Sequence, residues 1–227
     1  HVLIHFSGDL ILRTHMRMQG AWHIYRPGER WTLPRHRMRI LLATEAIVAV
    51  GFNIPVAEFL TGVELARHPV LLALGPDLAD PHFDRDEARR RITAAGRRPI
   101  DEVLLDQDVL SGIGNVLKSE ILFVARIHPF VPASSLDTAD IERLLDVSLR
   151  LMRMNVGDLV ASPPVYGRWT TGSLDPRARL HVYGRGGKPC RKCGTPIGVR
   201  KTGEDARLTY WCPTCQDGPA VYRRPAP

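Results

Sequence analysis

The four cysteines of this chain, all near its C-terminal end, are the side chains best suited to hold a metal ion. They form two pairs with two residues inside each, Cys190–Cys193 and Cys212–Cys215. Such a pair presents two thiolates to one tetrahedral ion, and a second pair after a hairpin-length segment closes the coordination shell. The spacing predicts a structural zinc ribbon with no open coordination position. Two disulfides or four unrelated cysteines are the alternative, which the strain of a disulfide across two residues disfavours.

Composition places the chain among ordinary globular proteins. It has 227 residues, 44% of them hydrophobic and 24% charged. No apolar run reaches the roughly 18 residues that span a bilayer, and no basic stretch followed by an apolar one opens the chain. The sequence therefore predicts a cytoplasmic protein and excludes a membrane partner.

Basic charge is clustered, with a formal net charge of +7 and a pI near 9.6. The segment from Arg177 through Lys201 carries only basic charges. A second cluster, relieved only by Glu29, consists of Arg13, Arg17, Arg26, Arg30, Arg35, Arg37 and Arg39. Clustered basic charge beside a zinc ribbon indicates a polyanionic partner, and nucleic acid is the favoured one. A solvated basic surface is the alternative.

The elements that must position these groups change along the chain. Short apolar runs separated by Gly and Pro turns predict strands over 1–6, 10–12, 20–25, 37–43 and 46–50, with a hairpin turn at 7–9. Residues 55–95 are predicted as helical and connecting, with a charged helix over 84–95. Two helices over 101–126 are broken at 111–115, and helical spacing of apolar residues predicts a further helix over 138–154.

The break at Gly112-Ile-Gly-Asn115 is a candidate anion-binding turn. Both glycines can adopt positive φ, and Asn115 is a favoured N-cap type. Backbone N–H groups at a helix N-terminus suit a phosphate. A plain corner between two helices is the alternative.

The motifs in their order along the chain resemble the formamidopyrimidine-DNA glycosylase / endonuclease VIII family. They are Leu104-Leu-Asp-Gln107, Gly112-Ile-Gly-Asn115, Glu120, Ile127-His-Pro129, Val182-Tyr-Gly-Arg185, Gly187-Lys-Pro-Cys190, Cys193-Gly-Thr-Pro-Ile197 and Tyr210-Trp-Cys-Pro-Thr-Cys-Gln216. Two further motifs, His15-Met-Arg-Met-Gln-Gly20 and Leu74-Gly-Pro-Asp77, extend the resemblance N-terminally. The resemblance covers essentially the whole chain.

The resemblance implies an α+β protein with the remnant of an N-terminal β-sandwich, a helix–two-turn–helix domain and a C-terminal zinc ribbon. The implied domains are an incomplete sandwich over 1–62, a connecting helical segment over 63–95, the helix–two-turn–helix domain over 96–160, a flexible loop over 161–180, the ribbon over 181–217 and a tail over 218–227.

The implied activity is base-excision repair by a DNA glycosylase with abasic-site (AP) lyase activity on oxidised bases. Such enzymes flip the damaged nucleotide out of the duplex, because its C1′ cannot be reached inside the stack. The implied partner is damaged double-stranded DNA, with single-stranded DNA as a second candidate. A monomer in a bacterial-type cytoplasm, associated with the nucleoid, is expected.

The resemblance also implies roles for individual residues. Met18 takes the position of an intercalating side chain, and Arg17 beside it that of a polar DNA contact. Asn115 and Gly114 belong to the phosphate-binding turn, and Arg185 is a further DNA contact. Arg207 corresponds to the zinc-hairpin arginine that grips phosphate and assists δ-elimination. Glu120 is expected to brace the helices rather than touch substrate.

Two departures from the family pattern refine the assignment. The formamidopyrimidine enzymes usually carry Arg-Arg-Phe-Gly where this chain reads Val50-Gly-Phe-Asn-Ile54. This favours the endonuclease VIII branch and oxidised pyrimidines, with Phe52 still a candidate wedge. Ala73 stands where some relatives place a basic DNA contact.

The family's nucleophile is not among these residues. Roughly 45 residues of the family pattern, including the N-terminal proline whose amine forms a Schiff base at C1′, are expected upstream of His1. Residues 1–227 by themselves are therefore predicted to be inactive. A natural, non-catalytic zinc-containing damaged-DNA-binding protein is the alternative, and a zinc-ribbon module unrelated to repair is a third interpretation.

Overall fold

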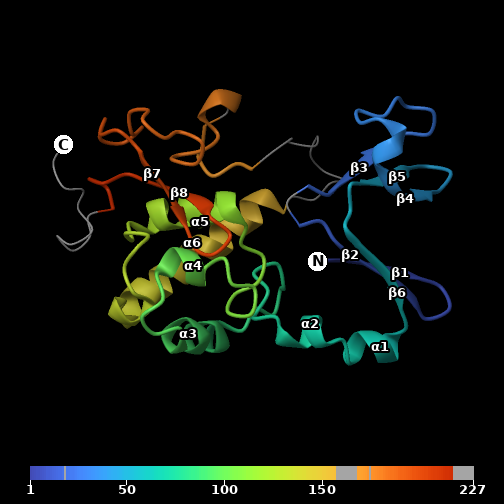
Figure 1. The fold of residues 1–227 in the computed structure, drawn as a ribbon, viewed down its shortest axis with the longest axis horizontal. Helices are drawn as coiled ribbons and strands as arrows, with labels where there is room; N and C mark the ends of the chain where they lie inside the picture. The colour runs from blue at the N-terminus through green and yellow to red at the C-terminus, as the bar shows by residue number, and fades with distance from the viewer. Residues whose placement is uncertain (18, 157–167, 174, 217–227) are drawn as a thin grey trace. The chain divides into compact units, whose positions relative to one another are not determined.

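The computed structural model describes residues 1–17, 19–156, 168–173 and 175–216, which divide into two compact units (Figure 1). The first, His1–Leu72, is built mainly of strands; the second, from Ala73 onward, is helical with one C-terminal β-hairpin. This confirms the predicted α+β organisation. No described helix is long and apolar enough to cross a membrane.

The first unit contains two antiparallel three-stranded sheets. Their strand orders are β1-β2-β6 and β3-β5-β4. The strands are β1 (Val2–Phe6), β2 (Leu10–His15), β3 (Ala21–Tyr25), β4 (Met38–Ala43), β5 (Val48–Phe52) and β6 (Val56–Leu60). Five of the six lie where strands were predicted, because their apolar runs are short and bounded by turn residues.

The turn between β1 and β2 is the predicted hairpin. Phe6 pairs with Leu10, so the loop is Ser7-Gly8-Asp9. Gly8 and Asp9 have φ of +77° and +56°, a conformation that glycine and aspartate tolerate better than most residues.

Strand β6 is absent from the prediction, which assigned its residues to the helical connection. It pairs with β2 and sets Glu58 opposite Arg13. Arg13 is only 5% exposed and forms an ion pair with Glu58. Arg13 therefore offers no exposed charge to a polyanionic partner. The pairing depends on a residue 45 positions away, which local sequence patterns do not reveal.

Phe52 lies in the core of the first unit. Its side chain has no exposed surface and packs edge-on against His23 and Trp31. A side chain buried in this way has no surface to offer a DNA duplex, so the wedge expected at Phe52 was wrong.

The helices of the second unit surround one apolar core. They are α3 (Arg85–Ala94), α4 (Ile100–Val103), α5 (Asn115–Ala125) and α6 (Thr138–Asn155); α1 (Gly62–Ala66) and α2 (Pro69–Ala73) precede them. Helix α6 starts at an Asp137 N-cap and buries Leu144, Leu145 and Leu151. It packs against α5, as the amphipathic pattern predicted.

Helix α4 is shorter than the helix predicted from Asp101 onward. The Asp106 side chain accepts a hydrogen bond from the backbone of Asp108, and the Gln107 carbonyl accepts one from Gly75. These bonds draw the backbone away from helical pairing, a known effect of aspartate inside a helical pattern. Residues 104–110 therefore form turns and do not continue the helix.

The C-terminal hairpin consists of β7 (Gly198–Thr202) and β8 (Arg207–Trp211), with Gly198 opposite Trp211. Strand β8 packs against α5 (Figure 1). Within the predicted flexible loop 161–180, the described Thr170 and Thr171 both donate their N–H groups to the Arg179 carbonyl. The predicted tail 218–227 lies outside the described residues.

Candidate functional site

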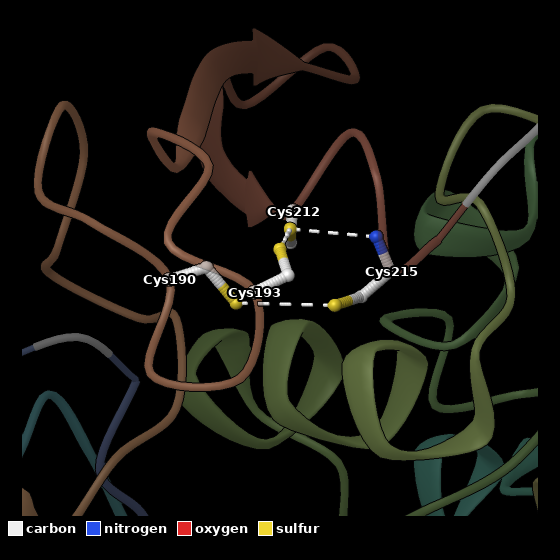
Figure 2. Close-up of side chains that lie close together, drawn as sticks. All are labelled: Cys190, Cys193, Cys212 and Cys215. Carbon is white, nitrogen blue, oxygen red and sulfur yellow. Dashed lines mark hydrogen bonds between the residues drawn. The ribbon is translucent and has the colours of Figure 1, made fainter.

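The four cysteines converge on one point beside the hairpin (Figure 2). All four sulfur atoms lie within 4.8 Å of one another. The Sγ atoms of Cys190 and Cys215 are 3.9 Å apart, and those of Cys193 and Cys212 are 3.4 Å apart. Tetrahedral zinc with Zn–S bonds of about 2.3 Å requires sulfur separations of about 3.8 Å. The donor set therefore fits a closed, structural zinc ion.

Backbone N–H groups support the cysteine sulfurs. Lys192 N lies 3.4 Å from Cys190 Sγ, and Cys215 N lies 3.4 Å from Cys212 Sγ. Gly194, at φ +79°, lets the first loop turn back so that its N–H donates to the Cys190 carbonyl. N–H groups aimed at sulfur favour the thiolate that zinc requires.

Gln216 ties the second cysteine pair to the helical core, a role that the sequence did not suggest. Its side chain is fully buried. Its Oε1 accepts a hydrogen bond of 2.9 Å from Cys212 N, and its Nε2 donates one of 2.9 Å to the Ile127 carbonyl. The metal centre is thus held by a polar contact as well as by apolar packing.

Glu120 has a bracing role, but it joins helix α5 to the chain that leads into the ribbon and not to a second helix, as the sequence had suggested. Its carboxylate is fully buried and accepts 2.8 Å hydrogen bonds from the backbone N–H groups of His181, Val182 and Tyr183. The Thr170 hydroxyl donates a further hydrogen bond to it. Four donors around one carboxylate fix the path of the backbone before Cys190.

The candidate phosphate turn has a different geometry from the predicted one. Only Gly112 has positive φ, at +102°, whereas Gly114 is extended. Gly114, not Asn115, occupies the N-cap position of α5, and no described side chain caps it. An uncapped helix N-terminus leaves backbone N–H groups available to an anion.

Gln107 shapes this turn. Its Oε1 accepts a hydrogen bond from Gly112 N, and its Nε2 donates one to the Ile113 carbonyl. The Asn115 Oδ1 is buried and has no hydrogen-bond partner among the described residues. A buried acceptor without a partner is uncommon in folded proteins.

The two arginines of the ribbon region differ in what their guanidinium groups contact. Arg207 opens β8, is 30% exposed and reaches Asp205 Oδ2 at 3.0 Å. Arg185 donates to the carbonyl oxygens of His181 and Pro189. Arg207 is thus held at the surface by an exposed carboxylate, whereas Arg185 is engaged inside its own loop.

In the first unit, Arg17 follows β2 and is exposed at φ +46°. The loop is tight, because Gly20 N donates a 2.8 Å hydrogen bond to the Met16 carbonyl. A Cβ at position 20 would meet that oxygen at 2.7 Å, so only glycine fits there. Met18 lies outside the described residues.

Comparison with known proteins gives matches over most of the chain. Residues 74–160 match the family described as "Formamidopyrimidine-DNA glycosylase H2TH domain", and residues 187–218 match "Zinc finger found in FPG and IleRS".

Among curated relatives, the chain is 40% identical over 223 residues to "Probable endonuclease 8 2" of Streptomyces coelicolor, covering 97% of this chain and 77% of the relative. It is 36% identical to "DNA-(apurinic or apyrimidinic site) lyase Nei2" of Mycolicibacterium smegmatis, covering 92% and 77%. It is 31% identical to "Endonuclease 8" of Escherichia coli, covering 95% and 79%.

A solved structure with a similar fold is described as "MutM in complex with carbocyclic 8-oxo-G containing DNA". The TM-score is 0.74 at 23% identity, over 95% of this chain and 78% of that chain. A similar structure, of Lactococcus lactis Fpg with DNA that contains an N7-benzyl-Fapy-dG lesion, has the same TM-score at 22% identity. At 22–23% identity, this likeness shows a shared fold and nothing further.

Proposed function

This chain belongs to the formamidopyrimidine-DNA glycosylase / endonuclease VIII family, and from this membership we propose that it acts in base-excision repair as a DNA glycosylase with AP lyase activity. The observation that carries the proposal is the 40% identity over 97% of the chain to a relative named as an endonuclease 8. Oxidised pyrimidines are the proposed substrates. The endonuclease 8 names and the Val50-Gly-Phe-Asn-Ile54 run both support this choice.

The proposed partner is damaged double-stranded DNA, bound by a monomer; single-stranded DNA is a second candidate. In this proposal the helix α5 N-terminus at Gly114, with Asn115, receives one phosphate, and Arg207 receives another. Both belong to the second unit. Backbone N–H groups suit a single phosphate oxygen, whereas a guanidinium can grip two. Arg17 and Met18 are proposed to contact the duplex around the flipped base, and Arg185 is proposed as a further DNA contact on the ribbon loop.

The zinc ion holds the ribbon that presents Arg207. With four thiolates in its shell, it has no position for water or substrate, and it supplies conformational rigidity. The domain limits that the family resemblance implies, from the incomplete sandwich over 1–62 to the tail over 218–227, are part of the same proposal.

We further propose that residues 1–227 do not form the family's Schiff base by themselves. Their lysines are Lys118, which is fully buried in α5, and Lys188, Lys192 and Lys201, which are exposed in the ribbon. None has the ring-held secondary amine of the proline that starts the reaction in the family. In this proposal, residues 1–227 supply DNA binding and phosphate contacts for a reaction whose nucleophile is not one of their lysines.

Borohydride trapping tests this proposal. The polypeptide of residues 1–227 is expected to give no covalent adduct with a duplex that contains an abasic site. A version extended upstream to a Met-Pro-Glu start is expected to give one. An adduct with residues 1–227 alone would overturn the proposed division of roles. If neither version is trapped and both bind the duplex with strong salt dependence, the non-catalytic damaged-DNA-binding protein becomes the better assignment.

Arg207→Ala is expected to weaken binding to an abasic-analogue duplex about tenfold at physiological salt, because one phosphate contact is lost. The slope of log affinity against log salt concentration should fall by about 0.9. Fluorescence anisotropy over a salt series measures both. Arg90→Ala is the matched control, because Arg90 is 73% exposed and paired with Glu87 in α3. Equal slopes for Arg207→Ala and the wild type would exclude a phosphate contact at Arg207.

A further inference from the structure

Lys118 is completely buried, which is rare for a lysine. It lies in α5, one turn after Asn115. Its Nζ donates a 2.7 Å hydrogen bond to Thr209 Oγ1 in β8 and lies 3.5 Å from the Leu208 carbonyl oxygen. The ammonium group of the helix is therefore bonded directly to the strand that begins with Arg207.

The bond continues into a network across four elements. Thr209 Oγ1 donates a 2.8 Å hydrogen bond to Asp101 Oδ2 in α4, and it lies 2.8 Å from Thr202 Oγ1 in β7. Thr209 and Asp101 are both fully buried. Asp101 thus supplies a counter-charge to Lys118 through a shared hydroxyl, and the network joins the two helices to both strands of the hairpin.

Stability alone does not call for a lysine here. Uncharged side chains of similar volume at both Lys118 and Asp101 would avoid the cost of taking two charges out of water, and such replacements of buried charge pairs are often neutral or stabilising. A buried charge instead imposes one geometry, because each misaligned arrangement leaves it without a partner. The arrangement that it imposes here is the register of β8 on α5.

We propose that Lys118 is a positioning residue that holds Arg207 at a fixed distance from the Gly112–Asn115 turn, so that both contact phosphates of one DNA strand. Lys118 lies three residues after Asn115, and Thr209 lies two residues after Arg207. The buried hydrogen bond between Lys118 and Thr209 therefore links helix α5, which begins at Asn115, to strand β8, which begins at Arg207. The inference rests on the proposed function, since it concerns how two DNA contacts are aligned.

The charge of Lys118 responds to pH in an accessible range. Burial lowers the pKa of Lys118 to about 8, with a smaller lowering from Arg207, while Asp101 and Glu102 act in the opposite direction. The ammonium form, with its full set of donors, therefore predominates below pH 8. As pH rises through 8, the side chain loses a proton, and its hold on Thr209 and the positive charge beside Arg207 weaken.

A double-mutant cycle with an abasic-analogue duplex tests the proposal. Lys118→Met is expected to weaken binding about tenfold in the wild-type background and less than about twofold in the Arg207→Ala background, since it acts through Arg207. Thr209→Val removes the same bond from the other side and should give the same pattern. Lys201→Met, an exposed lysine of the same hairpin, is the control and should be additive with Arg207→Ala.

A pH series separates positioning from a general loss of structure. Wild-type affinity is expected to fall as pH rises through about 8, and Lys118→Met should lack that transition, with circular dichroism and zinc content unchanged. Equal effects of Lys118→Met in both backgrounds, or a wild-type pH transition that persists in the variant, would refute this inference alone. Failure of the wild type to bind the duplex would instead refute the proposed function.

Discussion

Replacing Cys212 with serine is expected to abolish stoichiometric zinc binding and to lower affinity for an abasic-analogue duplex by at least about a hundredfold. Cys212 is fully buried at the start of the second pair, and its backbone N–H is also held by Gln216. A serine hydroxyl is a poor zinc ligand, and three remaining thiolates leave a coordination position open. Without the ion, the bonds that join the two cysteine pairs are lost, and the hairpin that carries Arg207 is no longer held in place.

Zinc content measured by atomic emission, with anisotropy on the same samples, checks this expectation. Thr214→Ala is the matched control, because Thr214 lies between Cys212 and Cys215 and its hydroxyl makes an exposed 2.8 Å hydrogen bond with the Thr195 hydroxyl. The control should keep one zinc ion per chain and bind DNA like the wild type. A Cys212→Ser protein with a full complement of zinc would show that the four thiolates are not the coordination shell.

Glu120→Gln is expected to destabilise the second unit by about 3–5 kcal/mol, since it removes the charge from a buried, fully hydrogen-bonded carboxylate. The amide keeps the shape of the side chain. However, one carboxylate oxygen is replaced by an NH₂ group, which cannot accept a hydrogen bond. In either orientation of the amide, this NH₂ group faces backbone N–H groups of residues 181–183, and in one orientation it also faces the Thr170 hydroxyl. At least one buried donor then has no acceptor.

Urea unfolding followed by circular dichroism measures this loss. Glu142→Gln is the matched control in the same unit: Glu142 is 32% exposed and pairs with Arg85 and Arg89. Partly exposed pairs contribute up to about 1 kcal/mol, so the control should remain close to the wild type. Equal unfolding midpoints for the two variants would mean that Glu120 does not brace the ribbon.

Local patterns predicted much of this molecule. Short stretches of sequence were enough to predict the C-x2-C pairs, the hairpin at Gly8 and the amphipathic helix α6. Each of these features has the expected structure. Such features depend on spacing and turn chemistry, which a sequence displays directly.

The features that were missed depend on partners far apart in the chain. Strand β6 pairs along its length with β2, and Gly75 donates its N–H to the Gln107 carbonyl in the turns that follow α4. Gln216 and Lys118 look like ordinary surface residues in the sequence, yet both are buried and bonded to residues far away in the chain. Only the tertiary structure identifies these polar residues as supports of the site.

The polar network of Lys118, Thr209 and Asp101 also limits how the protein can be recombined. The ribbon has the sequence hallmarks of a portable cassette, but its inward face is completed by side chains of α4 and α5. A chimera that joined this ribbon to helices from a distant relative would pair buried polar groups with the wrong partners. The natural unit of exchange is therefore the helices and ribbon together, from Ala73 onward, and substitutions within the network are expected to accumulate in concert.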